Sequence, residues 1–412
     1  MQLFPHGRQS RAPRSFLYCN FLQRQLARGA NRRHDWPAEL GGRLSSPRID
    51  LVVGTRPEAI KLAPVAAALA RRRRPLRLVL TGQHPLDMAE HGLDVYPRVA
   101  LDCPGGDDPQ AHAVEIARQV APLLAERPGL LVVQGDTASA LGGARAAFAA
   151  AVPVAHVEAG LRSFDPAMPW PEEEFRTAID ARAALLFAPT EISAANLYAE
   201  DVPGRILVTG NTAIDALMAV VPPRPSRVRE RLPLRLLVTC HRRESWGTGL
   251  RSIAEALIEL AGAQPVSIDV ILHPNPDVAS AMGAQLAGRA TIRLLDPLPH
   301  RAMIAAMQAC DILLSDSGGV QEEAPALGVP LLVLREKTER PEGVASGNMV
   351  LVGTDKRRIV DGVVRLLDPV ARAAMSRPAF PYGDGHSAER IAEHIGQFLA
   401  AGASETDEVR RA

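Results

Sequence analysis

Short apolar runs and amphipathic stretches alternate along most of the chain, beginning at Ile49. The runs are rich in Val, Leu and Ile and are nearly continuous, which is typical of strands buried on both faces of a parallel sheet. Alternation of such strands with helices predicts an α/β fold. In the first half, the pattern predicts strands at 49–53, 76–80, 130–133, 153–157 and 184–188, and helices near 58–71, 110–126, 138–150, 172–182 and 191–199.

The alternation pauses at a proline-rich segment, residues 221–234, and then restarts. Three prolines at 222, 223 and 225 indicate a stiff linker. The organisation predicts two Rossmann-like domains, 49–220 and 235–384, that face each other across an interdomain cleft, and a polar tail at 401–412. In the second half, strands are predicted at 235–239, 268–272, 291–295, 311–315, 330–334 and 349–352.

Residues 1–48 differ from the rest of the chain, because they hold many arginines, only two acids and no strand-like pattern. A transit peptide is one interpretation, since such segments are rich in arginine and poor in acids. A disordered tail, or a start codon placed too far upstream, is the favoured one.

Composition narrows the class of protein. A chain of 412 residues is long enough for two domains, and its net charge of +1 gives no indication of a nucleic-acid or membrane surface. No apolar run is long enough to span a bilayer. The four cysteines are scattered and form no Cys-x-x-Cys pair, so a reducing, cytoplasmic location is predicted and no thiolate metal site.

Three acids occupy notable positions in the first half. Asp136 and Glu158 directly follow predicted strands, and Glu172 opens the triplet Glu172–Glu174. Acids at the carboxyl edge of a parallel sheet lie where such folds bind ligands, and several together suggest proton transfer. Structural alternatives remain. Asp136 could be a helix N-cap, Glu158 could lie next to a helix N-cap, and the triplet could be the favourable acidic first turn of a helix.

A second candidate site follows the predicted strand at 311–315. Ser317, Gly318 and Gly319 form a strand-to-helix turn whose amides can approach a phosphate closely, and Glu323, one turn later, could accept hydrogen bonds from a ribose. A plain turn with a glycine cap is the alternative.

Three basic residues follow first strands of the two halves. Arg56 and Lys61 come after the strand at 49–53, where they could neutralise a diphosphate or simply begin a solvated helix. His241 follows the strand at 235–239 and precedes two arginines, which favours a phosphate-binding or proton-transfer role. No His, Asp or Glu cluster has metal-ligand spacing.

Taken in order, these motifs closely resemble the non-hydrolysing UDP-N-acetylglucosamine (UDP-GlcNAc) 2-epimerases over roughly residues 49–400. The resemblance rests on Gly54–Glu58, Thr81–His84, Gly135–Thr137, His156–Arg162, Pro171–Glu173, Gly210–Thr212, His241–Glu244, His273–Pro276, Asp316–Pro325, Thr338–Glu342 and Pro381–Gly385.

The resemblance implies a GT-B fold with UDP in the interdomain cleft, and a C-terminal helix near 385–400 that packs back on the first domain. It implies reversible conversion of UDP-GlcNAc to UDP-N-acetylmannosamine (UDP-ManNAc), by elimination of UDP to a 2-acetamidoglucal and re-addition, for cell-surface polysaccharide synthesis. The resemblance implies no metal or redox cofactor. It implies a homodimer.

The resemblance also assigns roles residue by residue. Acid and base candidates are Asp136, Glu158 and Glu172, with His241 as the catalytic histidine beside the phosphates. UDP-binding positions are Arg56, Lys61, Ser317, Gly318, Gly319, Glu323 and Arg340. An activating second UDP-GlcNAc would meet Gln83, His84, Arg243 and His273.

Several positions depart from the family pattern and leave the three acids unchanged. They are Phe175 beside the acid triplet, Pro85–Leu86, His300, Met303, Gln134 and Cys240. Four alternatives therefore stand beside the main hypothesis: a hydrolysing epimerase that releases UDP and ManNAc, an epimerase of a diacetamido-uronic acid nucleotide, a non-catalytic UDP-sugar binding protein, and a GT-B glycosyltransferase.

Overall fold

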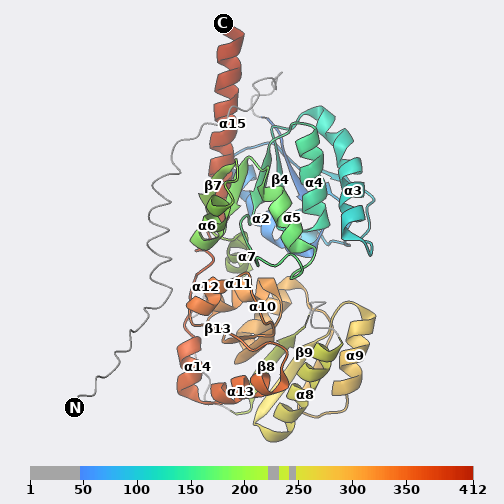
Figure 1. Ribbon diagram of the computed structural model, residues 1–412, viewed down its shortest axis with the longest axis vertical. Helices are drawn as coiled ribbons and strands as arrows, with labels where there is room; N and C mark the ends of the chain where they lie inside the picture. The colour runs from blue at the N-terminus through green and yellow to red at the C-terminus, as the bar shows by residue number, and fades with distance from the viewer. Residues whose placement is uncertain (1–46, 221–231, 241–246, 412) are drawn as a thin grey trace, which may run out of the picture.

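A computed structural model describes residues 47–220, 232–240 and 247–411, together with the side chains up to residue 402. Two parallel sheets, each covered by helices on both faces, lie one above the other (Figure 1). The α/β class predicted from the sequence is confirmed. The predicted extension at 1–48 and linker at 221–234 fall largely outside the described residues.

The first sheet has seven strands in the order β3-β2-β1-β4-β5-β6-β7. The strand order reverses between β1 and β4, and such a switch point is where open α/β sheets bind ligands. The strands are β1 (Ile49–Val53), β2 (Leu76–Leu80), β3 (Arg98–Ala100), β4 (Leu130–Gln134), β5 (Val154–Val157), β6 (Leu185–Ala188) and β7 (Arg205–Val208).

Successive residues of β1 point to opposite faces of this sheet, and each face has its own apolar core. Val52 packs towards α3 and α4, whereas Leu51 and Val53 pack towards α2 and α15. The helices of this domain are α2 (Arg56–Arg71), α3 (Pro109–Val120), α4 (Ala138–Ala149), α5 (Glu172–Asp180), α6 (Glu191–Ala199), α7 (Thr212–Val220) and α15 (Ser387–Arg411), with 3₁₀ turns at Ala89–His91 and Ala121–Glu126.

The second sheet has six strands in the order β10-β9-β8-β11-β12-β13, with its switch point between β8 and β11. The strands are β8 (Leu234–Thr239), β9 (Val266–Ile271), β10 (Ile292–Leu295), β11 (Ile312–Ser315), β12 (Leu331–Val333) and β13 (Met349–Leu351). The helices are α8 (Thr248–Ala263), α9 (Pro276–Leu286), α10 (His300–Ala309), α11 (Gly318–Leu327), α12 (Pro341–Ala345), α13 (Lys356–Leu367) and α14 (Pro369–Met375).

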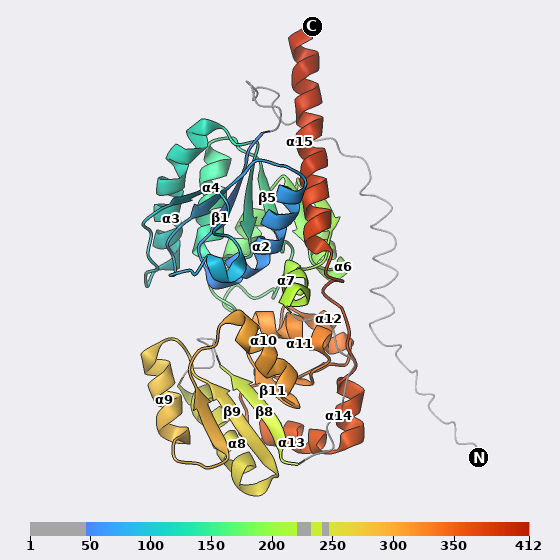
Figure 2. The same ribbon diagram turned by 180° about the vertical axis from the view of Figure 1, so that it is seen from behind.

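The last helix, α15, returns from the second domain and runs along the first (Figure 2). Its apolar side, with Ile391 and Ile395 fully buried, completes the core beside α2. The helix extends to Arg411, beyond the predicted end near residue 400. None of the helices within the described ranges is long and apolar enough to cross a membrane.

Three elements were not predicted from the sequence: β3, β7 and α7. Both are short edge strands with partly exposed residues: β3 has the sequence Arg-Val-Ala, and the apolar run of β7 is only three residues long, Ile-Leu-Val. Helix α7 carries Ile214 and Leu217 into the apolar core of the second domain, which makes it part of the junction between the domains.

Candidate active site at the interdomain seam

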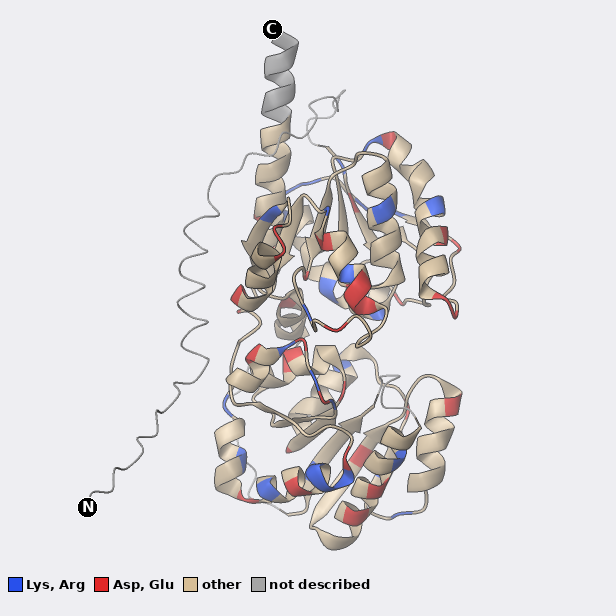
Figure 3. Ribbon diagram, in the orientation of Figure 1, with Lys and Arg blue, Asp and Glu red and all other residues tan. Residues whose placement is uncertain are grey.

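The carboxyl edges of the two sheets face each other, and charged residues gather on both sides of the seam (Figure 3). Helix α2 begins immediately after β1, where the Thr55 hydroxyl and the Glu58 carboxylate form a reciprocal capping box. This cap fixes the start of the helix that carries Arg56 and Lys61.

Glu158 lies directly after β5 and joins the two domains. Its backbone has a φ of 71°, a left-handed conformation that is uncommon for a residue with a side chain. Its carboxylate accepts hydrogen bonds from Lys61 Nζ at 2.6 Å and from Gln134, and Arg340 Nη2 of the second domain lies 3.2 Å away. Glu158 is not the neighbour of a helix N-cap, because the next helix begins only at Glu172.

A second carboxylate, Glu322 on α11, shares both cations. It lies 2.9 Å from Lys61 Nζ and 2.7 Å from Arg340 Nε. Arg340 also pairs with Glu339, which Arg335 approaches at 2.9 Å. The side chains of this cluster are less than a tenth exposed, so each charge depends on its partners rather than on water.

Burial and neighbouring charges shift the pKa values of this cluster in opposite directions. Burial, reinforced by the charge of Glu322, raises the pKa of Glu158 above its ordinary value despite Lys61 and Arg340. For Glu322, burial is outweighed by Lys61 and Arg340, and its pKa is lowered. Glu158 is thus the carboxyl suited to gain and lose a proton, and Glu322 is suited to remain an anion.

Asp136 follows β4 in a turn whose Gly135 has a φ of 67°. Its carboxylate pairs with Arg176, which α5 holds nearly buried, while about a quarter of the Asp136 side chain stays exposed. The alternative that Asp136 caps a helix is wrong: the N-cap of α4 is Thr137, whose hydroxyl accepts from Ala140 N.

Glu172 is the first residue of α5, and the acid triplet forms the first turn of that helix, as the structural alternative predicted. Arg176 lies one turn further on the same face, which places Glu172 beside the partner of Asp136. Glu173 is buried and accepts hydrogen bonds from the amides of Ser163 and Phe164, so it also holds the preceding loop.

The predicted phosphate turn lies at the start of α11. Ser317 is the N-cap residue but its side chain makes no capping bond. A Cβ on Gly318 would come within 2.9 Å of the Arg340 guanidinium, which would have to shift, whereas nothing lies within 4 Å of a Cβ on Gly319. The open first turn of the helix suits an anion.

Two further predicted UDP-binding residues already have partners. Glu323 accepts from His300 Nε2 at 2.9 Å, and Arg56 donates to the carbonyl of Leu298 in the second domain at 3.0 Å. Both contacts lie on the side of the seam formed by α2, α10 and α11.

Of the residues predicted to bind an activator, Gln83 and His84 follow β2 and His273 follows β9, each one strand away from a switch point. Gln83 accepts from the Ser139 hydroxyl, the His84 amide donates to the Gly54 carbonyl, and His273 Nδ1 accepts from Asn275 N. His241 and Arg243 lie outside the described residues.

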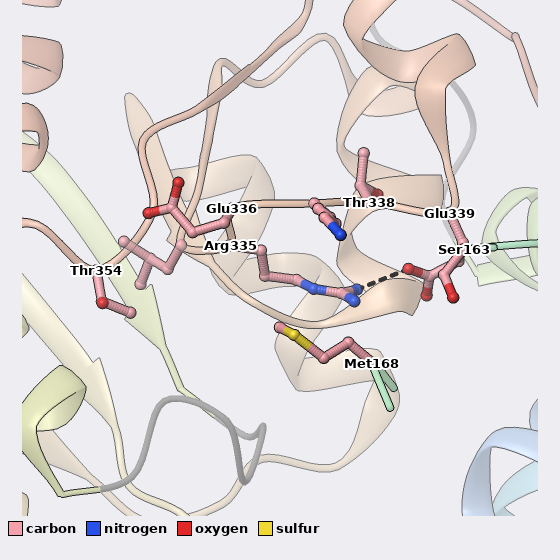
Figure 4. Close-up of a pocket in the computed structure, with 9 residues that line it drawn as sticks. Ser163, Met168, Arg335, Glu336, Thr338, Glu339 and Thr354 are labelled. Atoms are coloured by element: carbon pink, nitrogen blue, oxygen red, sulfur yellow. Dashed lines mark ion pairs between the residues drawn. The ribbon is translucent and has the colours of Figure 1, made fainter. Parts of the chain in front are cut away.

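A pocket of about 550 Å³, including its open mouth, lies on the other side of the seam (Figure 4). Ser163 and Met168 line it from the first domain, and the segment Leu334–Glu339 with Thr354 lines it from the second. The ion pair of Arg335 with Glu339 forms its inner wall, so the pocket adjoins the cluster around Arg340. In the described part of the chain, no group of three or more His, Cys, Asp or Glu side chains could hold a metal ion.

The sequence model of a family described as UDP-N-acetylglucosamine 2-epimerase matches residues 67–396. The chain belongs to this family. A UDP-N-acetylglucosamine 2-epimerase of Escherichia coli K12 is 42% identical over 364 residues, which cover 84% of this chain and 97% of that protein.

Solved structures of the family agree with the fold. A UDP-GlcNAc 2-epimerase from Neisseria meningitidis, bound to UDP-GlcNAc, has a TM-score of 0.79 at 33% identity and covers 85% of this chain and all of its own. An enzyme of the same name from Methanocaldococcus jannaschii, in complex with UDP-GlcNAc and UDP, has a TM-score of 0.75 at 30% identity and covers 85% of this chain and 99% of its own. The predicted GT-B fold is confirmed.

Four charged residues of the site were not predicted from the sequence: Arg176, Glu322, Arg335 and Glu339. The spacing of four residues between Glu172 and Arg176 on one helix is a signal that could have identified Arg176. Phe175, where the family pattern has asparagine, is 1% exposed and packs into the apolar core of the first domain.

Proposed function

We propose that this protein interconverts UDP-GlcNAc and UDP-ManNAc without hydrolysis, by eliminating UDP and adding it back. Membership of the family and the relatives whose crystal structures hold UDP-GlcNAc support the substrate. The observation that carries the proposal is Glu158, a buried carboxyl with a raised pKa that Lys61 and Arg340 hold between the two domains.

The chemistry explains why carboxylates and cations are needed together. The C2 proton of the sugar is not acidified by a neighbouring ring carbonyl, so a base removes it as the C1–O bond to the diphosphate breaks. The C2–H electron pair forms the C1=C2 double bond of 2-acetamidoglucal, and UDP leaves with the C1–O pair. In the return step, a UDP oxygen attacks C1 and an acid protonates C2 on the opposite face.

The proton carriers in this proposal are Asp136, Glu158 and Glu172, since all three come from the carboxyl edge of the first sheet. His241 acts beside the phosphates. The open start of α11 receives the diphosphate, and Glu323 receives the ribose. Arg56, Lys61 and Arg340 supply positive charge, and the last two exchange a carboxylate partner for phosphate when UDP is bound.

Incubation with UDP-GlcNAc in deuterated water tests this proposal by NMR. The expected result is deuterium at C2 in both UDP-GlcNAc and UDP-ManNAc, with UDP remaining attached at equilibrium. Steady accumulation of free UDP and ManNAc would instead assign a hydrolysing epimerase. Tight UDP binding with no exchange at C2 would leave only a UDP-sugar binding protein.

We propose two further features that the family resemblance implies. The chain works as a homodimer, which sedimentation would establish. A second UDP-GlcNAc activates it through Gln83, His84, Arg243 and His273, which predicts sigmoidal kinetics in UDP-GlcNAc. Hyperbolic kinetics that are unchanged in a Gln83→Ala variant would contradict the activator site.

A further inference from the structure

His156, on β5 and outside the set of proton carriers, has a hydrogen-bond acceptor at each of its two ring nitrogens. Its Nδ1 lies 2.6 Å from Asp180 Oδ1, and its Nε2 lies 2.8 Å from the carbonyl oxygen of Gly135. The side chains of His156 and Asp180 are both completely buried. Gly135 immediately precedes Asp136, so the ring is hydrogen-bonded to the turn that carries one proposed proton carrier.

The other oxygen of Asp180 is hydrogen-bonded to the turn that carries a second proposed proton carrier, Glu158. Asp180 Oδ2 accepts from the amide of Gly160 at 3.1 Å and lies 2.8 Å from Arg162 Nη2. Gly160 is two residues after Glu158, and a Cβ there would lie 2.2 Å from the carbonyl oxygen of Ser193, so the turn has little freedom to move. One buried pair therefore connects the turns of Asp136 and Glu158, which adjacent strands carry.

The partners also define the charge of the ring. The second oxygen of Asp180 faces two donors, the Arg162 guanidinium and the Gly160 amide, and these contacts favour the carboxylate form of Asp180. A carboxylate and a carbonyl offer no proton to share, so both ring nitrogens must donate. The ring then carries a proton on each nitrogen.

We propose that His156 is a positioning residue: as an imidazolium paired with Asp180, it fixes the spacing between Asp136 and Glu158. This inference rests on the proposed function, because it assumes that both acids carry protons. A reacting proton must meet its base at close range, and a misplacement of about 1 Å costs on the order of 10²-fold in rate. His156 itself touches no substrate.

Two substitutions at His156 separate its two contacts. An asparagine places its amide nitrogen near the position of Nδ1, so His156→Asn keeps the contact to Asp180 and loses that to Gly135. A glutamine reaches the position of Nε2, so His156→Gln keeps the contact to Gly135. We expect kcat to fall about 10²-fold in both variants, because the loss of either contact breaks the connection between the two turns. KM for UDP-GlcNAc should change less than about 3-fold in both.

His112→Asn is the matched control in the same domain. His112 is also buried and its Nε2 contacts a backbone carbonyl, that of Cys103 at 2.9 Å, but this carbonyl is not next to a proposed proton carrier. Its kcat should stay within about 3-fold of wild type. Equal loss of kcat in His156→Asn and His112→Asn would overturn the proposal, as would wild-type kcat in His156→Asn.

The protonation of the ring has its own spectroscopic test, independent of turnover. In ¹⁵N-labelled protein at neutral pH, the His156 ring, assigned by its absence in His156→Asn, should show a proton on both nitrogens. A ring with one protonated nitrogen at neutral pH would refute the imidazolium. Failure of C2 exchange in the wild type would sink the proposed function instead, and would leave this signature unchanged.

Discussion

Glu158 and Glu322 form a matched pair of carboxyls, and their replacement should have opposite effects on stability. Each contacts both Lys61 and Arg340, and each is almost fully buried. Burial dominates at Glu158 and raises its pKa, whereas the two cations dominate at Glu322 and lower its pKa. The folded protein stabilises the charged form of Glu322, which Glu322→Gln removes. It destabilises the charged form of Glu158, which Glu158→Gln removes.

The size of the effect follows from what each substitution leaves behind. Without the charge of Glu322, Lys61 keeps only Glu158 as a carboxylate partner, and breaking a buried pair in this way costs about 3–5 kcal/mol. For a domain of this size, that corresponds to a fall in Tm of roughly 10 °C. The free energy of unfolding of Glu158→Gln should lie within about 1 kcal/mol of the wild-type value or above it. The variant should lose C2 exchange.

The dependence on pH has a definite sign for each carboxyl. Because the folded pKa of Glu322 lies below its ordinary value of 4.5, its stabilisation is present above that pH and is lost as the pH falls through the folded pKa. The difference in the free energy of unfolding between wild type and Glu322→Gln should therefore become smaller at low pH. For Glu158 the folded pKa lies above 4.5, so its contribution to stability is lost as the pH rises. The stability of Glu158→Gln relative to wild type should therefore increase with pH.

Thermal and urea unfolding of the two variants, followed by circular dichroism from about pH 2 to pH 8, measures these differences. Glu174→Gln serves as the control, because Glu174 is an exposed acid in the first turn of α5 that accepts a hydrogen bond from Gln110; it should change stability by less than about 0.5 kcal/mol. Equal destabilisation by Glu158→Gln and Glu322→Gln at neutral pH would refute the reasoning, as would a wild-type Tm for Glu322→Gln.

Three other predictions follow from single contacts. Asp136→Asn and Glu172→Gln should each reduce C2 exchange by about 10²–10⁴-fold while UDP affinity, measured by calorimetry, is retained; normal turnover would remove that acid from the mechanism. Gly318→Ala should weaken UDP binding at least about 10-fold, because its Cβ would collide with the guanidinium packed on it, whereas Gly319→Ala, with open space around it, should do so far less. Burial raises the pKa of Glu58 to about 6, so its stabilisation should be lost as the pH rises from about 4.5 through 6, and Glu58→Gln should remove that slope from urea unfolding curves; an unchanged slope would contradict it.

The sequence carries enough information for the sheets and for one side of the site. Strands such as β1 are buried along their whole length and appear as unbroken apolar runs, and an acid that follows such a strand must lie at the carboxyl edge. Asp136 and Glu158 could be located by this argument alone, whereas β3 and β7 could not, because edge strands bury too little to leave a pattern.

The pairing across the seam could not be predicted from the sequence. Glu158 and Arg340 are 182 residues apart and meet only because the two domains close on each other. A local pattern records which face of a helix is buried, but it does not record which charge from another domain will cover it. The position of Lys61 between two carboxylates, Glu158 and Glu322, could not be predicted from the sequence either.

The return of α15 to the first domain has a consequence for the order in which the protein is made. Until Ser387 and the residues after it leave the ribosome, the side of α2 that faces Ile391 and Ile395 has no cover, and the first domain must wait through the synthesis of residues 221–386. At ~5–20 residues per second this delay is on the order of 10–30 s. The domain that begins the chain is therefore the last to be completed, and its open apolar flank is the natural place for a chaperone to bind.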